Sequence, residues 1–280
     1  MTTETTTQRP SAVSRIGAPL VLASVLASTL GIVIAQFLDD VGDGVLAEIL
    51  GGDAVLYNNR AELSGVSDLA WAGGFALCLL IGLFTLFIYP TQRGHGVSRL
   101  VLLWTLLHVL RQALTQAVML PFDDTGQLAM AYSTFDLPPG LDLVIAAGGG
   151  VGLLLIALAA AAAFLAYTPH RRLVSEGRSR LVFILWFALI PAVASAFAAI
   201  PFFLPDSEGL VLPGLPLVAV MFIATLAAAP GTTTVLGPED ERVTPWPWGL
   251  AVFLVVLLVM FLGVLQGGVS IDPRTWGPEQ

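Results

Sequence analysis

The sequence predicts an all-α integral membrane protein, a helix bundle with about seven transmembrane helices. Of its 280 residues, 56% are hydrophobic and only 11% are charged, and the mean hydropathy is +0.85. A soluble domain carries about 25% charged residues, so this chain cannot cover a water-facing surface. Its apolar segments each approach the ~20 residues that a helix needs to cross a bilayer. They lack the alternation of apolar and polar residues that barrel strands show, so we expect helices.

The expected spans define a single transmembrane domain at residues 17–266. A polar, threonine-rich N-terminal tail (1–16), expected to be disordered and cytoplasmic, precedes it, and an external C-terminal tail (267–280) follows. The first apolar run is longer than the 7–15 residues of a signal-peptide core, which favours a retained anchor. The predicted spans are 17–37, 69–89, 99–120, 142–167, 181–204, 211–229 and 249–266.

Three of these spans carry features that predict their surroundings. The fourth begins with a glycine cluster, "AAGGGVG", which favours close packing inside the bundle. The fifth contains Pro191 and Pro201, which predict kinks whose freed carbonyl groups need other donors. The seventh is apolar all round, which is typical of a peripheral helix that faces lipid.

The arginines predict the orientation of the chain. With a cytoplasmic N-terminus, nine of the twelve basic residues fall in inner segments, as the positive-inside rule requires. An odd number of spans then places the C-terminus outside. We expect this topology in the plasma membrane of a prokaryote-like cell. The nine are Arg9, Arg15, Arg93, Arg99, Arg171, Arg172, Arg178, Arg180 and Arg242.

The third span is unusual because polar side chains follow one of its faces. His108 lies about nine residues beyond Arg99, or ~13 Å deep at helical rise, and Arg111 lies near the midplane. Polar groups in hydrocarbon cost several kcal/mol unless they are partnered, so this stripe must face protein or a water-filled cavity. The candidate ligand or polar-network residues are Thr105, His108, Arg111, Gln112, Thr115 and Gln116.

The partner of Arg111 is expected among carboxylates at the outer ends of other spans. No predicted span carries an internal Asp or Glu, and an arginine side chain can extend outward by several Å. A water-mediated pair is therefore expected with one of four residues, Asp39, Asp40, Asp68 or Asp142.

These features favour a non-enzymatic scaffold, sensor or accessory subunit whose polar stripe is structural or meets a partner. The alternative is a small-solute or ion transporter that uses His108, Arg111, Gln112 and Gln116 as an outward-opening site. An intramembrane enzyme ranks third, because no nucleophile–base pair or catalytic residues emerge. A wide cavity that reaches the stripe would favour transport, and a sealed, paired stripe would favour a scaffold.

Composition also limits cofactors and partners. The three histidines form no helical pair, and a lone cysteine, Cys78, sits in an apolar run, so we expect no catalytic residue, metal or cofactor. A chain with net charge −8 has no basic face for nucleic acid. The expected partners are the lipid bilayer and, as open alternatives, another membrane subunit or further copies of the chain.

Overall fold

A computed structural model describes residues 17–91, 96–168, 177–204 and 246–271 of the chain. The described part is mostly helical and contains six helices that are long and apolar enough to cross a membrane. They match six of the seven predicted spans, so the prediction of long apolar helices is confirmed. The seventh prediction, residues 211–229, lies outside the described residues. The six are Ala18–Ile49, Asp68–Thr91, Val97–Met119, Leu141–Leu165, Leu181–Phe203 and Trp248–Gly267.

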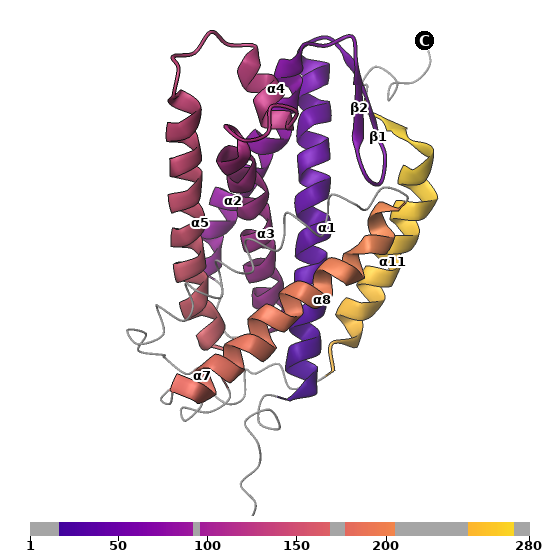
Figure 1. The fold of residues 1–280 in the computed structure, drawn as a ribbon. Helices are drawn as coiled ribbons and strands as arrows, with labels where there is room; N and C mark the ends of the chain where they lie inside the picture. The colour runs from indigo at the N-terminus through magenta and orange to yellow at the C-terminus, as the bar shows by residue number, and fades with distance from the viewer. Residues whose placement is uncertain (1–16, 92–95, 169–176, 205–245, 272–280) are drawn as a thin grey trace, which may run out of the picture.

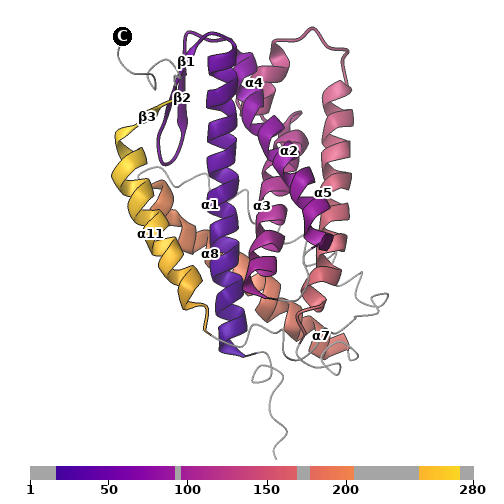
Figure 2. The ribbon, with the colours of Figure 1, turned by 180° about the vertical axis from the view of Figure 1, so that it is seen from behind.

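Helix α1 (Ala18–Ile49) runs through the middle of the bundle, as Figures 1 and 2 show. It packs against α2 (Gly73–Ile88), α3 (Val97–Met119) and α8 (Ile190–Ala199). Small side chains at four-residue spacing, Ala23, Ala27, Gly31 and Ala35, form its buried stripe. A Cβ on Gly31 would lie 2.9 Å from the carbonyl oxygen of Trp104, so only glycine permits this approach of α1 to α3.

Helices α1 and α2 cross at a pair of glycines. A Cβ on Gly42 would overlap the backbone carbonyl of Gly73, and a Cβ on Gly73 would overlap that of Gly42. The short helix η2 (Asp68–Ala72) leads into α2, and η3 (Tyr89–Thr91) follows it. Helix α4 (Gln127–Ser133) packs on η2. The α1–α2 crossing therefore lies beside α4, at the end of the bundle that α1 reaches last (Figure 1).

Helix α5 (Leu141–Leu165) lies at the edge of the bundle, against α3 (Figure 1). The prediction that its glycine cluster places it inside the bundle is wrong. Gly149 and Gly152 contact Leu114, whereas a Cβ on Gly148 or Gly150 would meet nothing within 4 Å. Small residues on one helix permit close contact only where a neighbour lies, and here they serve a single neighbour.

The fifth predicted span is one continuous run of helix built from four pieces. These are α7 (Gly177–Ile184), the π-helical turn η4 (Leu185–Leu189), α8 and η5 (Ile200–Phe203). A π-turn directly before Pro191 fits the loss of a backbone donor at that proline. Helix α11 (Trp248–Val264), followed by η7 (Leu265–Gly267), is largely exposed, as expected of a helix that faces lipid.

A small antiparallel sheet adds a feature that the all-α prediction did not include. Strands β1 (Asp53–Leu56), β2 (Ala61–Ser64) and β3 (Val269–Ser270) are ordered β2-β1-β3. Ala54 pairs with Leu63, and Val55 pairs with both Glu62 and Ser270. The sheet lies at the end of the bundle where α1 and α11 finish (Figure 2).

Candidate functional site

Helix α1 continues twelve residues beyond the predicted end of the first span, to Ile49. This extension carries Asp39, Asp40 and Asp43 into the protein, where their exposed fractions are 1%, 4% and 0%. The expectation that no span holds an internal acid is therefore wrong. Asp39 and Asp43 are four residues apart, so they lie on one face of α1.

Two amides of α3 hold the carboxylate of Asp39. Gln112 Nε2 donates to Asp39 Oδ2 and Gln116 Nε2 donates to Asp39 Oδ1, each at 2.9 Å. The two glutamines are four residues apart, so one face of α3 presents both donors. The polar stripe of α3 therefore faces protein, and its amides satisfy both oxygens of a buried carboxylate.

The carboxylate of Asp43 joins three further elements. Its Oδ1 accepts a hydrogen bond of 2.6 Å from the backbone N–H of Gly74, at the start of α2. Its Oδ2 accepts one of 3.0 Å from Gln127 Nε2 of α4. Gln116 Nε2 also lies 3.5 Å from Gln127 Oε1, which links this carboxylate to that of Asp39. We call Asp39, Asp40, Asp43, Arg111, Gln112, Gln116 and Gln127 the carboxylate–amide network.

Arg111 contributes the network's one guanidinium, with 7% of the residue exposed. Its Nη2 donates to Gln112 Oε1 at 3.2 Å, so Gln112 connects it to Asp39. Within the described ranges, no carboxylate oxygen comes within 4.0 Å of this guanidinium. Three buried carboxylates thus face one buried cation, and a fully ionised network would carry two uncompensated negative charges.

His108 belongs to a second polar cluster, deeper along α1 and α3. Its Nε2 lies 2.9 Å from Ser28 Oγ, which in turn lies 2.7 Å from Ser195 Oγ of α8. The imidazole ring stacks on the ring of Trp104. The residue is 5% exposed, so this hydroxyl–imidazole contact ties three helices together out of contact with solvent.

Ser24 supplies a donor to the carbonyl group that Pro191 leaves without its helical partner. Proline has no N–H for the carbonyl four residues earlier, that of Phe187. Ser24 Oγ donates to this carbonyl oxygen at 2.7 Å and accepts a hydrogen bond of 3.0 Å from Trp104 Nε1. The predicted need of a freed carbonyl for another donor is thereby met from α1.

The remaining predicted residues take less part in these contacts. Thr105 is buried and its Oγ1 has no hydrogen-bond partner, while Thr115 is half-buried further along the same helix. Asp68 is exposed in η2, and Asp142 is half-buried at the start of α5. A pairing of Arg111 with either remains a prediction without a contact among the described residues.

Five residues of these clusters were missed by sequence reasoning. Asp43 and Gln127 lie outside the predicted spans, and the three serines lie within predicted spans at positions to which no role was given, although the four-residue spacing of Ser24 and Ser28 is visible in the sequence. They are Ser24, Ser28, Asp43, Gln127 and Ser195.

Among the described side chains, no three His, Cys, Asp or Glu residues are arranged to hold a metal ion. No protein-family model, curated protein or solved structure matches the chain. The geometry of the two clusters is therefore the basis for a functional proposal.

Proposed function

We propose that this chain is a non-enzymatic membrane sensor or accessory subunit that responds to protonation of its carboxylate–amide network. The observation that carries the proposal is the ratio of three buried carboxylates to one buried guanidinium. An uncompensated charge in a low-dielectric interior costs several kcal/mol, so such groups take up protons instead. The packing of α1 against its neighbours then depends on how many protons the network holds.

The elements packed around the network determine how its charge is balanced. Helix α3 supplies Arg111 and, deeper, His108, which contacts the hydroxyl of Ser28 on α1. Helix α2 supplies the buried thiol of Cys78. Helix α4 supplies the amide of Gln127, and Asp68 precedes α2 in an exposed position. Loss of protons from Asp40 or Asp43 adds negative charge beside Asp39, and the part of the chain that the structure describes places no cation other than Arg111 against these carboxylates. Repulsion then loosens the contacts that Asp43 makes with α2 and α4.

The test uses the full-length chain purified in detergent, followed from about pH 5 to about pH 8. The folded network holds protons that carboxylates of the unfolded chain have released, so the melting temperature should fall as pH rises. Protection of the α4 amides against hydrogen exchange, corrected at each pH for the intrinsic exchange rate, should fall over the same range. Asp43→Asn should flatten both trends, while Asp53→Asn, at an exposed position of β1, should leave them unchanged. Equal pH dependence in wild type and Asp43→Asn would refute the proposal.

A transporter of protons or small cations is the second candidate, and unpaired buried polar atoms favour it. Arg111 Nε, His108 Nδ1 and Gln116 Oε1 are buried without a hydrogen-bond partner. Such atoms are uncommon in native proteins and often mark a functional site. Proteoliposomes with an interior pH dye separate the two candidates, since a transporter dissipates an imposed pH gradient and Asp39→Asn abolishes that flux. A sensor leaves the gradient as protein-free vesicles do.

The proposal includes seven spans, a cytoplasmic N-terminus and residence in a prokaryote-like plasma membrane. The direction of the described helices supports the odd number. Helices α8 and α11 both run toward the end of the bundle that holds the sheet (Figure 1). Asn58, beyond β1, donates to the carbonyls of Phe202 and Leu204, and β3 follows α11 onto β1. That α8 and α11 run in the same direction is what we expect of a chain with an odd number of spans.

The exposed surfaces of the bundle indicate its partners. The exposed apolar side chains of α2, α5 and α11 suit the lipid bilayer. An accessory subunit also meets another membrane protein or further copies of itself, and pull-down of a tagged chain from solubilised membranes tests this. The acidic composition gives no reason to propose a nucleic-acid partner.

A further inference from the structure

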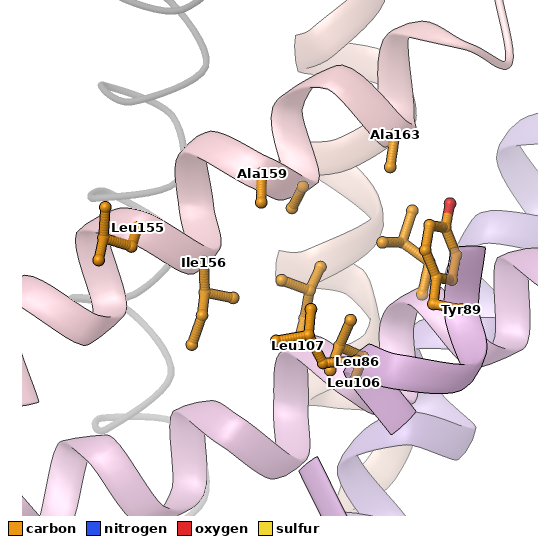
Figure 3. Close-up of a pocket in the computed structure, with 10 residues that line it drawn as sticks. Leu86, Tyr89, Leu106, Leu107, Leu155, Ile156, Ala159 and Ala163 are labelled. Carbon is orange, nitrogen blue, oxygen red and sulfur yellow. The ribbon is translucent and has the colours of Figure 1, made fainter. Parts of the chain in front are cut away.

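A second feature of the bundle, remote from the carboxylate–amide network, is an apolar cavity of about 270 Å³ between α2, α3 and α5. Figure 3 shows its lining, which consists of leucine, isoleucine and alanine side chains with one tyrosine, Tyr89. The volume is close to the lower end of small-molecule sites, about 300 Å³. Its lining residues are Leu86, Tyr89, Leu103, Leu106, Leu107, Leu155, Ile156, Ala159, Ala160 and Ala163.

The cavity reaches the surface of the bundle that would face hydrocarbon. Leu86 and Leu155 line it and are 40% and 59% exposed. A polar solute would lose its hydrogen bonds to water here and find one hydroxyl in return, which is unfavourable. A hydrocarbon chain has no hydrogen bonds to lose on entry, and it gains dispersion contacts with the lining side chains. The lining therefore selects an acyl chain over a polar solute.

The depth of the cavity matches one leaflet. Leu103 to Leu107 lie four to eight residues beyond Arg99, or ~6–12 Å along α3. Half of a bilayer's hydrocarbon core is about 15 Å thick. At the shallow end, the guanidinium of Arg99 lies 4.9 Å from the centroid of the Tyr89 ring. An aromatic ring and an arginine at this depth are typical of the headgroup boundary.

The charge at that end of the bundle favours an anionic headgroup. In the sequence, segments 92–99 and 166–180 adjoin the ends of α2, α3, α5 and α7, and they hold six arginines against one acid, Glu176. Basic clusters between helices on one side of a membrane attract anionic lipids. The six are Arg93, Arg99, Arg171, Arg172, Arg178 and Arg180.

We propose that the cavity between α2, α3 and α5 binds one acyl chain of an anionic phospholipid, with the headgroup phosphate against Arg99. This site is independent of the proton response proposed above. On α3, the cavity is lined by Leu103, Leu106 and Leu107. The carboxylate–amide network uses Arg111, Gln112 and Gln116, which lie further along the same helix. The bound chain would add to the packing of α5, which among the described residues is mostly exposed.

The experiment reconstitutes the full chain with phosphatidylglycerol or phosphatidylcholine of identical acyl chains, each carrying a photoactivatable group near the chain end. Cross-links should form with phosphatidylglycerol and map to residues 86–107 and 155–163. Ala159→Phe fills the cavity at an exposed position and should abolish them. Ala147→Phe, an exposed alanine of the same helix outside the cavity, should not.

The headgroup contact has its own variants. Arg99→Gln should reduce cross-linking by phosphatidylglycerol about fivefold, and Arg99→Lys, which keeps the charge, should restore most of it. Equal cross-linking by the two lipids overturns the proposal. So does an equal yield from Ala159→Phe and Ala147→Phe, or a wild-type pattern spread evenly over the exposed faces of all helices.

Discussion

Gln112 reaches Asp39 across the interface of α3 and α1, with 2.9 Å between Nε2 and Oδ2. The same side chain accepts a hydrogen bond from Arg111 through its Oε1. One neutral amide therefore connects the buried cation to the buried anion, and no direct ion pair forms between them. This arrangement lets the carboxylate gain or lose a proton without breaking a bond to the guanidinium.

The first prediction concerns the cost of removing the buried cation. Arg111→Leu leaves three buried carboxylates without a guanidinium, so the melting temperature should fall, by the equivalent of about 3–5 kcal/mol. Adding Asp39→Asn to this variant removes one of the stranded charges and should recover part of the loss. Arg60→Leu is the control, because Arg60 forms an exposed pair with Glu62 that is worth about 1 kcal/mol or less. A double variant no more stable than Arg111→Leu would show that the two sites are not coupled.

A second prediction uses neighbouring glycines of α5 as a matched pair. A Cβ on Gly149 would lie 3.0 Å from the carbonyl oxygen of Leu114, whereas one on Gly148 would meet nothing within 4 Å. Gly149→Leu should therefore lower the melting temperature by the equivalent of about 1–3 kcal/mol, as overpacking does. Gly148→Leu should have little effect in the same measurement. Similar losses in both variants would contradict the placement of α5.

Ser24 and Pro191 provide a third prediction. Ser24→Ala removes the donor to Phe187's carbonyl and the acceptor of Trp104 Nε1, which should destabilise the chain by about 1–3 kcal/mol. In a Pro191→Ala background, residue 191 regains an N–H for that carbonyl, so Ser24→Ala should cost less there. Thermal unfolding of the two single variants and the double variant measures the difference. Additive losses would mean that Ser24 does not compensate for the proline.

The sequence predicts those features of the fold that depend on residues close together in the chain. The centres of six spans follow from runs of apolar residues, and the structure confirms them. The end of the first span was misplaced because hydropathy treats Asp39, Asp40 and Asp43 as loop residues. Their burial depends on donors far along the chain, Gln112 and Gln116, which lie 73 and 77 residues after Asp39. No local pattern carries that information.

Helical periodicity predicted that the polar side chains of α3 share one side of the helix and face protein or a water-filled cavity, and Gln112 and Gln116 of this stripe donate to Asp39 in the structure. A carboxylate was expected beside Arg111, whereas the amide of Gln112 lies between Arg111 and Asp39. Gln127 lies in a short helix that no apolar run announces, and Asp43 lies beyond the predicted span. The edge position of α5 was missed for a similar reason, since small residues indicate close packing without indicating how many neighbours a helix has.

The last prediction tests the proposed topology. The sheet and α4 lie at one end of the bundle, and the end of α2, the start of α3, the end of α5 and the start of α7 lie at the other (Figure 1). The arginine asymmetry predicts that the second end is cytoplasmic. Reporter fusions at residues 55 and 130 should therefore read external, and a fusion at residue 175 should read cytoplasmic.

Cysteine labelling in intact cells checks the same sides without truncation. Cys78 is fully buried, and replacing it with alanine provides a cysteine-free background. In this background, Asn59→Cys should react with an impermeant maleimide and Gln92→Cys should not. A reversed pattern at any two positions overturns the N-inside topology. If residues 55 and 130 read external but a C-terminal fusion reads cytoplasmic, the number of spans is even and that part of the proposal is overturned.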